Sequence, residues 1–382
     1  MTTDISTTVS GIEVTRPNST GHKKRIASLD VARVIAIAIV VFVHSVEMIY
    51  GFRDLIPEHT APLDYSIMHY IGRLGVPLFL FITGALILRK PMDTTSDVFK
   101  FYKHNLIPLL VTSEIWIVIS NIFLYFFYHQ AGAEACFANG DPFDFGELLR
   151  QMLFVDLVNL KQWWYIPMII GIYVVMPFLS FVVRNFPPKA MSVLIIISIC
   201  AFFALPTYNL YAGYWGWYVV PSFYLETRFY GGAYGTFVIL GYYLQQGMFK
   251  KVNVWIWVAV LIGSAVMGTM AATDGFRIWY DNFWILLSSI ALMEIIFRID
   301  RIHFKEKPGV PMRMVSWVSR TTFGIFLIHT MLMYPLYTPV KAITDPVLAT
   351  FALFALTFLA SIGVTSVLAA IKPARRALLD MK

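Results

Sequence analysis

Long apolar stretches alternate with short polar segments along most of the chain. A helix of ~20 mostly apolar residues is long enough to cross the hydrocarbon core of a bilayer. Ten stretches satisfy this rule and predict transmembrane helices at residues 30–50, 66–88, 104–128, 164–183, 190–206, 229–246, 252–272, 279–297, 317–338 and 347–371. The pattern therefore predicts an all-α integral membrane protein, a bundle of about ten transmembrane helices.

Polar segments flank this predicted membrane domain, which spans residues 29–371. Residues 1–28 are rich in Ser and Thr and lack the apolar core and cleavage site of a signal peptide, so they predict a disordered cytoplasmic tail. Residues 372–382 predict a short basic cytoplasmic tail.

Lysine and arginine gather in every second connection between the predicted helices. The basic set lies at 23–25, 89–103, 184–189, 250–251, 298–313 and 372–376. Because positive residues accumulate in cytoplasmic loops, this asymmetry predicts that both termini are cytoplasmic. It also explains most of the net charge of +7, so we do not expect nucleic acid as a partner. A basic cytoplasmic face also suits a polyanionic cosubstrate.

The composition agrees with a membrane protein. The chain is 58% hydrophobic and 14% charged, whereas soluble domains are about a quarter charged. Its two cysteines, Cys136 and Cys200, are far apart, and no zinc, haem or P-loop spacing is present. We therefore expect neither a disulfide nor a metal site.

Two longer segments are predicted on the outer side. Residues 129–163 contain "FGELLRQMLFV", an amphipathic stretch that suits the membrane interface. Residues 207–228 are dense in Tyr and Trp. These rings suit either stacking on sugars or an interfacial aromatic belt.

The first predicted helix carries ionisable groups within an apolar run. Arg33 and His44 are eleven residues apart, which places them ~20° apart on one helical face and ~16 Å apart along the axis. Asp30 lies on the same side, and Glu47 is close enough to orient the His44 imidazole. Ionisable groups inside spans commonly mark a pathway or reaction site. The alternatives are that Arg33 and Asp30 snorkel at a helix end and that His44 is a buried, hydrogen-bonded histidine.

Two later spans also contain ionisable groups. Glu114 lies near the middle of the third span, and His329 lies about as deep in the ninth as His44 does in the first. A common cavity would bring these groups together, and Glu114 would alternatively pair with a cation of the bundle. Gly84, in the second span, suits a close approach of two helices.

Five stretches, in order, resemble the membrane acyltransferase-3 family. They are the Arg33–His44 spacing preceded by "SLD", "GVPLFLFITGALIL", "FYKHNLIPLLVTSEIW", "WWYIPMIIGIYVVMPFL" and "SRTTFGIFLIHTML". The resemblance covers about residues 26–371 and is closest to the branch that includes the enterobacterial common antigen O-acetyltransferase. One departure is the segment before Pro108, where the family often has two arginines and this chain has Lys103-His104-Asn105.

This resemblance implies an enzyme of the bacterial cytoplasmic membrane. It would transfer an acyl group, commonly acetyl, from cytosolic acetyl-CoA or another acyl-CoA to a hydroxyl of a carbohydrate or lipid-linked glycan. Its partners would be these substrates, membrane lipids and, where the protein assembles, further copies of the chain. By residue, the resemblance implies that Arg33 contacts the CoA phosphates and that His44 is the catalytic base. With these two we expect Glu47 and His329 in catalysis and Asp30, Lys100, Lys103 and Arg320 in cofactor binding, and we expect the substrate to contact Glu114, Trp163, Trp164 and Tyr165.

Alternatives remain open at this stage. His44 would act either as a general base in direct transfer or as a nucleophile that carries the acyl group. A transporter that uses His44, Glu114 and His329 as a proton relay is the competing class of function, although we find no internal repeat in the chain. A sensor or assembly subunit would leave the intramembrane histidines unexplained.

Overall fold

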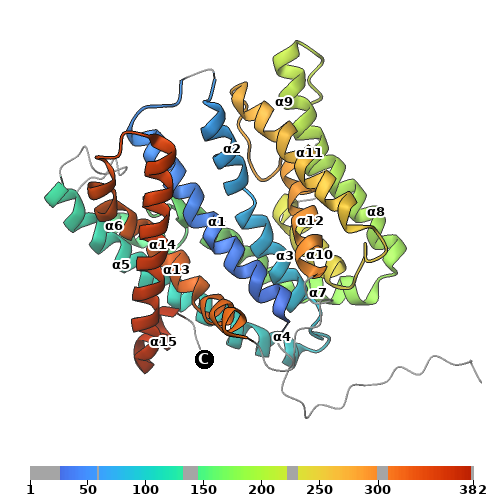
Figure 1. Ribbon diagram of the computed structural model, residues 1–382. Helices are drawn as coiled ribbons and strands as arrows, with labels where there is room; N and C mark the ends of the chain where they lie inside the picture. The colour runs from blue at the N-terminus through green and yellow to red at the C-terminus, as the bar shows by residue number, and fades with distance from the viewer. Residues whose placement is uncertain (1–25, 58–59, 132–144, 222–230, 299–308, 380–382) are drawn as a thin grey trace, which may run out of the picture.

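The computed structural model describes residues 26–57, 60–131, 145–221, 231–298 and 309–379. Within these ranges the chain is helical and contains no strand. The helices are α1 (Ala27–Phe52), α2 (Leu63–Gly72), α3 (Gly75–Ile87), α4 (Thr95–Phe101), α5 (Ile107–Ala131), α6 (Phe145–Met152), α7 (Tyr165–Asn185), α8 (Pro188–Ile199), α9 (Leu205–Trp215), α10 (Gly232–Gln245), α11 (Val254–Thr273), α12 (Phe283–Phe297), α13 (Val310–Val340), α14 (Pro346–Ala370) and α15 (Lys372–Leu379). The predicted all-α membrane bundle is confirmed (Figure 1).

The described part of the chain has eight helical segments that are long and apolar enough to cross a membrane. They correspond to eight of the ten predicted spans. The predicted spans 229–246 and 279–297 are the shorter helices α10 and α12, of 14 and 15 residues. Most residues of these two helices are buried, because α10 packs against α3 and α8 and α12 packs against α11 and α1.

The second predicted span is broken into α2 and α3. Pro77 lies in the first turn of α3 and has no N–H to donate, and its ring would collide with the carbonyl four residues earlier in a continuous helix. That carbonyl belongs to Arg73, the C-cap residue of α2. The break therefore lies inside the bundle and leaves a buried arginine at the junction.

Two other prolines follow single turns of π-helix. One such turn, Tyr102–Leu106, precedes Pro108 and joins α4 to α5. The other, Cys200–Ala204, precedes Pro206 and joins α8 to α9. The predicted outer segment 207–228 begins as a helix, because Pro206 is tolerated in the first turn of α9 and the helix continues to Trp215.

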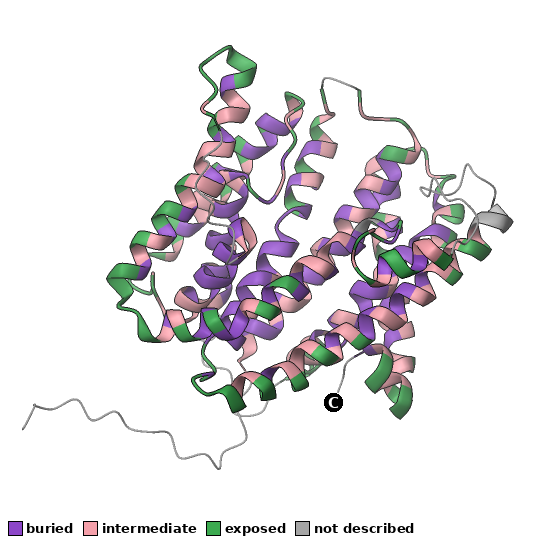
Figure 2. Ribbon diagram, turned by 180° about the vertical axis from the view of Figure 1, so that it is seen from behind, coloured by how far each residue is buried: buried purple, intermediate pink, exposed green. Residues whose placement is uncertain are grey.

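Helix α1 lies in the interior and packs against α2, α3, α13 and α14, and buried residues concentrate around it (Figure 2). Beside it, α3 and α10 approach closely through glycines. A Cβ on Gly84 would overlap the Val238 carbonyl, and a Cβ on Gly241 would overlap the Phe81 backbone. The packing role expected of Gly84 is confirmed.

Helix α1 begins at the end of the bundle where α15 lies (Figure 1). We call this the inner end and the opposite one the outer end. Helix α15 is not a free tail, because it packs against α5, α13 and α14. Its Leu379 is buried, and the Trp116 indole N–H donates to the Leu378 carbonyl at 2.8 Å.

Candidate functional site

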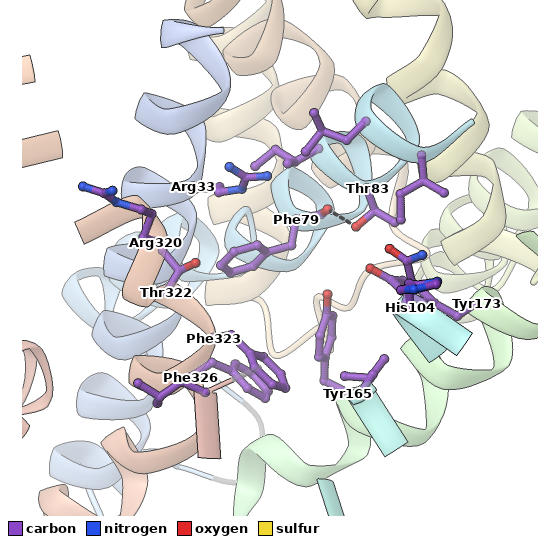
Figure 3. A pocket seen from close by; sticks show the side chains of 16 residues that line it. Arg33, Phe79, Thr83, His104, Tyr165, Tyr173, Arg320, Thr322, Phe323 and Phe326 are labelled. Atoms are coloured by element: carbon purple, nitrogen blue, oxygen red, sulfur yellow. Dashed lines mark hydrogen bonds between the residues drawn. The ribbon is translucent and has the colours of Figure 1, made fainter. Parts of the chain in front are cut away.

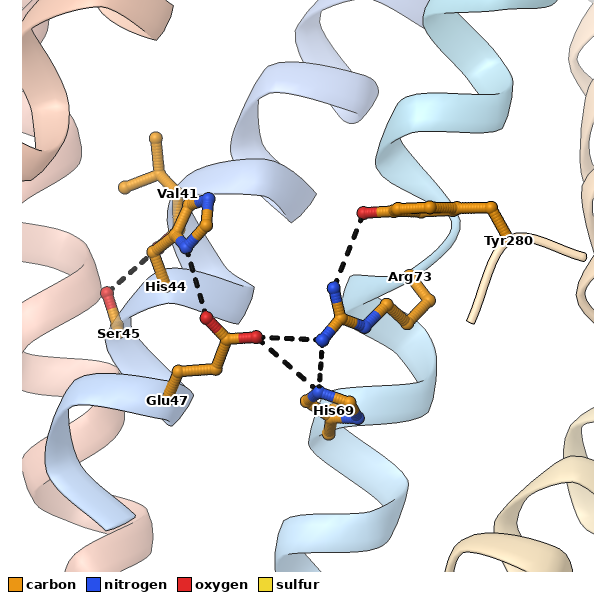
Figure 4. Close-up of polar contacts among 7 residues, drawn as sticks. All are labelled: Val41, His44, Ser45, Glu47, His69, Arg73 and Tyr280. Carbon is orange, nitrogen blue, oxygen red and sulfur yellow. Dashed lines mark hydrogen bonds and ion pairs between the residues drawn. The ribbon is translucent and has the colours of Figure 1, made fainter. Parts of the chain in front are cut away.

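His44 and Glu47 lie one turn apart on α1 and contact each other inside the bundle. The His44 Nδ1 is 3.2 Å from the Glu47 Oε2 (Figure 4). A carboxylate only accepts hydrogen bonds, so Nδ1 carries the proton and donates. In the neutral imidazole, this contact makes the His44 Nε2 the nitrogen that can accept a proton from another molecule.

Glu47 is held from its other side by residues at the end of α2. An Arg73 guanidinium nitrogen lies 2.9 Å from the Glu47 Oε1 and 2.7 Å from the His69 Nε2. Because a guanidinium only donates, the His69 Nε2 accepts this hydrogen bond. The side chains of Glu47 and Arg73 are 13% and 8% exposed, so this ion pair is shielded from water.

Arg73 is itself held by the segment before α12. Its guanidinium lies 4.4 Å from the centre of the Trp279 ring, and one nitrogen is 3.5 Å from the Tyr280 hydroxyl. Trp164, at the end of the 3-10 turn that precedes α7, stacks on Tyr280 with ring centres 5.3 Å apart. Helices α1 and α2 and the segments before α7 and α12 therefore hold the Glu47 carboxylate together.

His329, on α13, lies beside His44, with ring centres 5.3 Å apart. Its Nδ1 donates to the Phe326 carbonyl at 2.7 Å. Its Nε2 is buried and has no hydrogen-bond partner within the described residues. The similar depth predicted for these two histidines thus corresponds to direct proximity.

A cavity of about 430 Å³ opens at the inner end (Figure 3). Arg33 and Arg320 line it, as do His104 and Asn105 from the π-helical turn. The rest of its wall is mainly apolar and aromatic, and includes Phe79, Ile82, Leu86, Leu109, Tyr165, Phe323, Phe326 and Leu379. The Tyr165 and Phe326 rings contact each other at 5.2 Å, and the Phe326 ring lies 6.0 Å from the His329 ring. Phe326 therefore lies on the cavity wall and also contacts His329.

A second cavity, of about 400 Å³, lies toward the outer end. Glu47, His69 and Arg73 form its buried wall, and Arg277 and Trp279 lie on its more exposed part. His44 itself lines neither cavity, but Phe326 of the inner cavity contacts His329 beside His44, so the His44–Glu47 pair lies between residues of the two cavities. One is lined by Arg33, eleven residues before His44, and the other by Glu47.

The predicted cofactor-binding residues are placed differently from one another. Arg33 and Arg320 line the inner cavity, but Lys100 and Lys103 are exposed and do not line it. The π-helical turn presents His104 and Asn105 there instead. Asp30 is buried and accepts hydrogen bonds from Ser316 and Ser319 of α13, 3.2 and 2.7 Å long, while its Oδ1 lies 3.4 Å from Arg33. Asp30 thus holds Arg33 and α13 and is not on the cavity wall.

The predicted substrate-binding residues are also dispersed. Tyr165 lines the inner cavity, Trp164 packs against Tyr280, and Trp163 is buried. Glu114 lines neither of the two cavities, and its Oε2 has no hydrogen-bond partner within the described residues. The expected ion pair of Glu114 with a bundle cation is absent from that part of the chain.

Sequence reasoning missed the outer half of the site, namely His69, Arg73, Arg277, Trp279 and Tyr280. Arg73 and His69 both lie within the second predicted span, so the rule that singled out His44 applies to them equally. No comparable sequence feature marked Arg277 and Trp279, because an arginine and a tryptophan two residues apart in a predicted loop are common in proteins without a binding site there.

These features define a class of protein: a polytopic helical membrane protein whose interior holds an oriented imidazole between two cavities. The chain matches the acyltransferase-3 family, described as an acyltransferase domain, over residues 26–366, and it belongs to that family. No curated protein and no solved structure matches the chain.

Proposed function

We propose that the protein is an O-acyltransferase of the bacterial cytoplasmic membrane. It moves an acyl group, most simply acetyl, from cytosolic acyl-CoA to a hydroxyl of a carbohydrate or lipid-linked glycan that arrives from the outer side. Family membership supports acyl transfer in a membrane. The resemblance to the enterobacterial common antigen O-acetyltransferase branch supports the choice of donor and acceptor.

One observation carries the proposal: the His44–Glu47 pair lies between an inner cavity with arginines on its wall and an outer cavity that reaches Glu47. Acyl-CoA carries phosphates at one end and the thioester at the end of a long arm. Arg33 and Arg320 suit the phosphates, because a guanidinium binds phosphate oxygens through two parallel hydrogen bonds. The aromatic walls suit the arm, and the Tyr165–Phe326 contact is the barrier that the thioester must pass.

His44 is the base in this mechanism. As the acceptor oxygen attacks the thioester carbonyl, its proton moves to the His44 Nε2, and the carbon–sulfur bond then breaks. The departing thiolate takes the proton back, so the enzyme ends unchanged. Glu47 keeps Nδ1 protonated and stabilises the transient imidazolium, as a buried carboxylate does in hydrolase triads. In the alternative, the His44 Nε2 accepts the acyl group first and then passes it to the acceptor.

The test is release of free thiol from acetyl-CoA by the purified protein in lipid vesicles, with and without a glycolipid fraction. We expect release by the wild type, stimulated by the fraction, and its loss in Arg33→Ala and in His44→Ala. Lys189→Ala is the matched control, because Lys189 is an exposed cation at the inner end that does not line the inner cavity. Trapping of an acylated protein without acceptor would reject direct transfer.

Two results would overturn the proposal. Normal turnover by folded His44→Ala would remove His44 from the chemistry in either mechanism. No consumption of any acyl-CoA by folded wild-type protein would favour the transporter, since a permease has no reason to cleave a thioester.

A further inference from the structure

Trp279 contacts two arginines at once. Its ring centre lies 4.4 Å from the Arg73 guanidinium carbon and 4.8 Å from that of Arg277. The two guanidinium groups are therefore no further apart than the sum of these distances. Each is attracted to the negative face of the indole, but the two positive charges repel each other.

The two arginines differ in how their charge is balanced. Arg73 is buried and forms an ion pair with Glu47. Arg277 is exposed on the outer cavity, and no carboxylate of the described residues lies within 4.0 Å of it. Glu47 is the only acidic group of the described residues on the wall of that cavity, and Arg73 already occupies it. Asp281, on the adjoining third cavity, interacts electrostatically with Arg277 but forms no ion-pair contact with it, so the guanidinium stays available on the outer cavity.

Arg277 is also well placed to hold an anion. Stacking on an indole orients the plane of a guanidinium and leaves its N–H edge available, and that edge matches the two oxygens of a carboxylate or phosphate. A bound anion would also offset the repulsion between the two arginines. Trp279 thus fixes the orientation of the Arg277 guanidinium. The cavity beside it leaves room for the remainder of an anionic ligand.

A third cavity, of about 290 Å³, shares Arg277 and Trp279 with the outer cavity. Its other lining residues are Pro206, Thr207, Leu210, Asp281 and Asn282. Arg277 is therefore accessible from two adjoining cavities. A ligand longer than one ring can occupy both while its anionic group contacts Arg277.

We propose that the outer cavity binds an anionic acyl acceptor: a sugar that carries a carboxylate or a phosphate, held by Arg277, with a hydroxyl directed at the His44–Glu47 pair. The proposal rests on the proposed function and adds the charge class of the acceptor. It explains why an exposed arginine lies on the same cavity as the buried carboxylate that orients His44.

The experiment measures binding directly, so it does not depend on turnover. Methyl glucoside, methyl glucuronide and glucose 1-phosphate are titrated into the purified protein by calorimetry. The first probe is neutral, the second carries a carboxylate and the third a phosphate, so the last two distinguish the sources of the anion. The variants are Arg277→Gln, Arg277→Lys and the control Lys341→Gln, in which an exposed cation that lines none of the three cavities is removed.

We expect at least one anionic probe to bind about tenfold more tightly than methyl glucoside. Arg277→Gln should abolish that preference, Arg277→Lys should keep only part of it, and Lys341→Gln should keep all of it. Raised salt should reduce the preference because exposed charges are screened. Equal binding of all three probes, no binding of any, or an undiminished preference in Arg277→Gln would overturn the proposal. In each of these cases His44-dependent thiol release would still report separately on the proposed function.

Discussion

The inner and outer cavities have similar volumes, about 430 and 400 Å³, but opposite arrangements of polarity. The inner cavity has arginines of α1 and α13 on its wall and ends at the Tyr165 and Phe326 rings. The outer cavity has its most buried wall formed by the Glu47–Arg73 ion pair. The inner cavity therefore suits a molecule with a charged head and a thin arm, and the outer one suits a polar molecule that presents a hydroxyl.

This difference suggests that the two cavities have different roles: the inner one binds the donor, and the outer one binds the acceptor beside the catalytic pair. Under the proposed function, charge on the inner wall would attract and hold the anionic cosubstrate. Glu47, at the buried end of the outer cavity, would orient the imidazole that takes the proton. Substitutions should therefore separate effects on the donor from effects on chemistry, and the variants below test that separation.

The largest effect is expected from Glu47→Gln. Removing the carboxylate charge deprives His44 of the partner that orients it, so kcat should fall by about 10²- to 10⁴-fold while the KM for acyl-CoA changes little. The measurement is steady-state thiol release over a range of acetyl-CoA concentrations. Because Glu47→Gln alone leaves Arg73 as a buried unpaired charge, thermal unfolding must be measured alongside.

The control for this substitution is the double variant Glu47→Gln/Arg73→Gln, which removes both charges of the pair. We expect it to recover stability but not kcat. A kcat within threefold of the wild type in either folded variant would contradict the role of Glu47.

Next in size are the arginines of the inner cavity. Arg33→Gln and Arg320→Gln should each raise the KM for acyl-CoA about ten- to a hundredfold, because each removes charge-assisted hydrogen bonds to phosphate. The affinity of the anionic outer-cavity probes should stay unchanged. If these substitutions weakened the outer probes and spared the donor, the assignment of the two cavities would be reversed.

A smaller effect is expected at α15, whose Leu379 is buried and lines the inner cavity. Leu379→Ala should raise the KM for acyl-CoA by roughly threefold to tenfold, because it removes packing between α15 and the cavity wall. Kinetics with acetyl-CoA and thermal unfolding together provide the measurement. Leu356→Ala on α14 is the matched control, since Leu356 is exposed and lines neither cavity, and an equal KM change in both variants would count against a role of α15 in donor binding.

The sequence predicted the parts of the site that depend on helical periodicity. The spacing of Arg33, His44 and Glu47 along α1 follows from one helix, and the depth of His329 follows from counting along another. Other parts of the site depend on departures from regular helices. Lys103 is exposed while His104 lines the cavity, and both lie in the π-helical turn ahead of Pro108.

The contacts of Arg73 and Leu379 depend on tertiary packing. Arg73 meets Glu47 because α2 ends at the break before Pro77, and it meets Tyr280, which is 207 residues away along the chain. The pattern "KPARRALL" is consistent with a basic amphipathic helix, but the cavity wall that Leu379 completes is formed by other helices. Periodicity within one segment carries no information about such partners.

The smallest expected effect concerns the barrier between the inner cavity and the histidines. Phe326 contacts both Tyr165 and His329, so Phe326→Ala should open a path for water toward His44. We expect roughly a threefold increase in thiol release without acceptor and a smaller share of acyl groups reaching the acceptor, because an active site that admits water loses its reactive group to hydrolysis. The exposed Phe181 of α7 supplies the control Phe181→Ala. An unchanged ratio of hydrolysis to transfer in folded Phe326→Ala would show that water is excluded elsewhere, and the comparison of the two cavities would then need a barrier other than this ring.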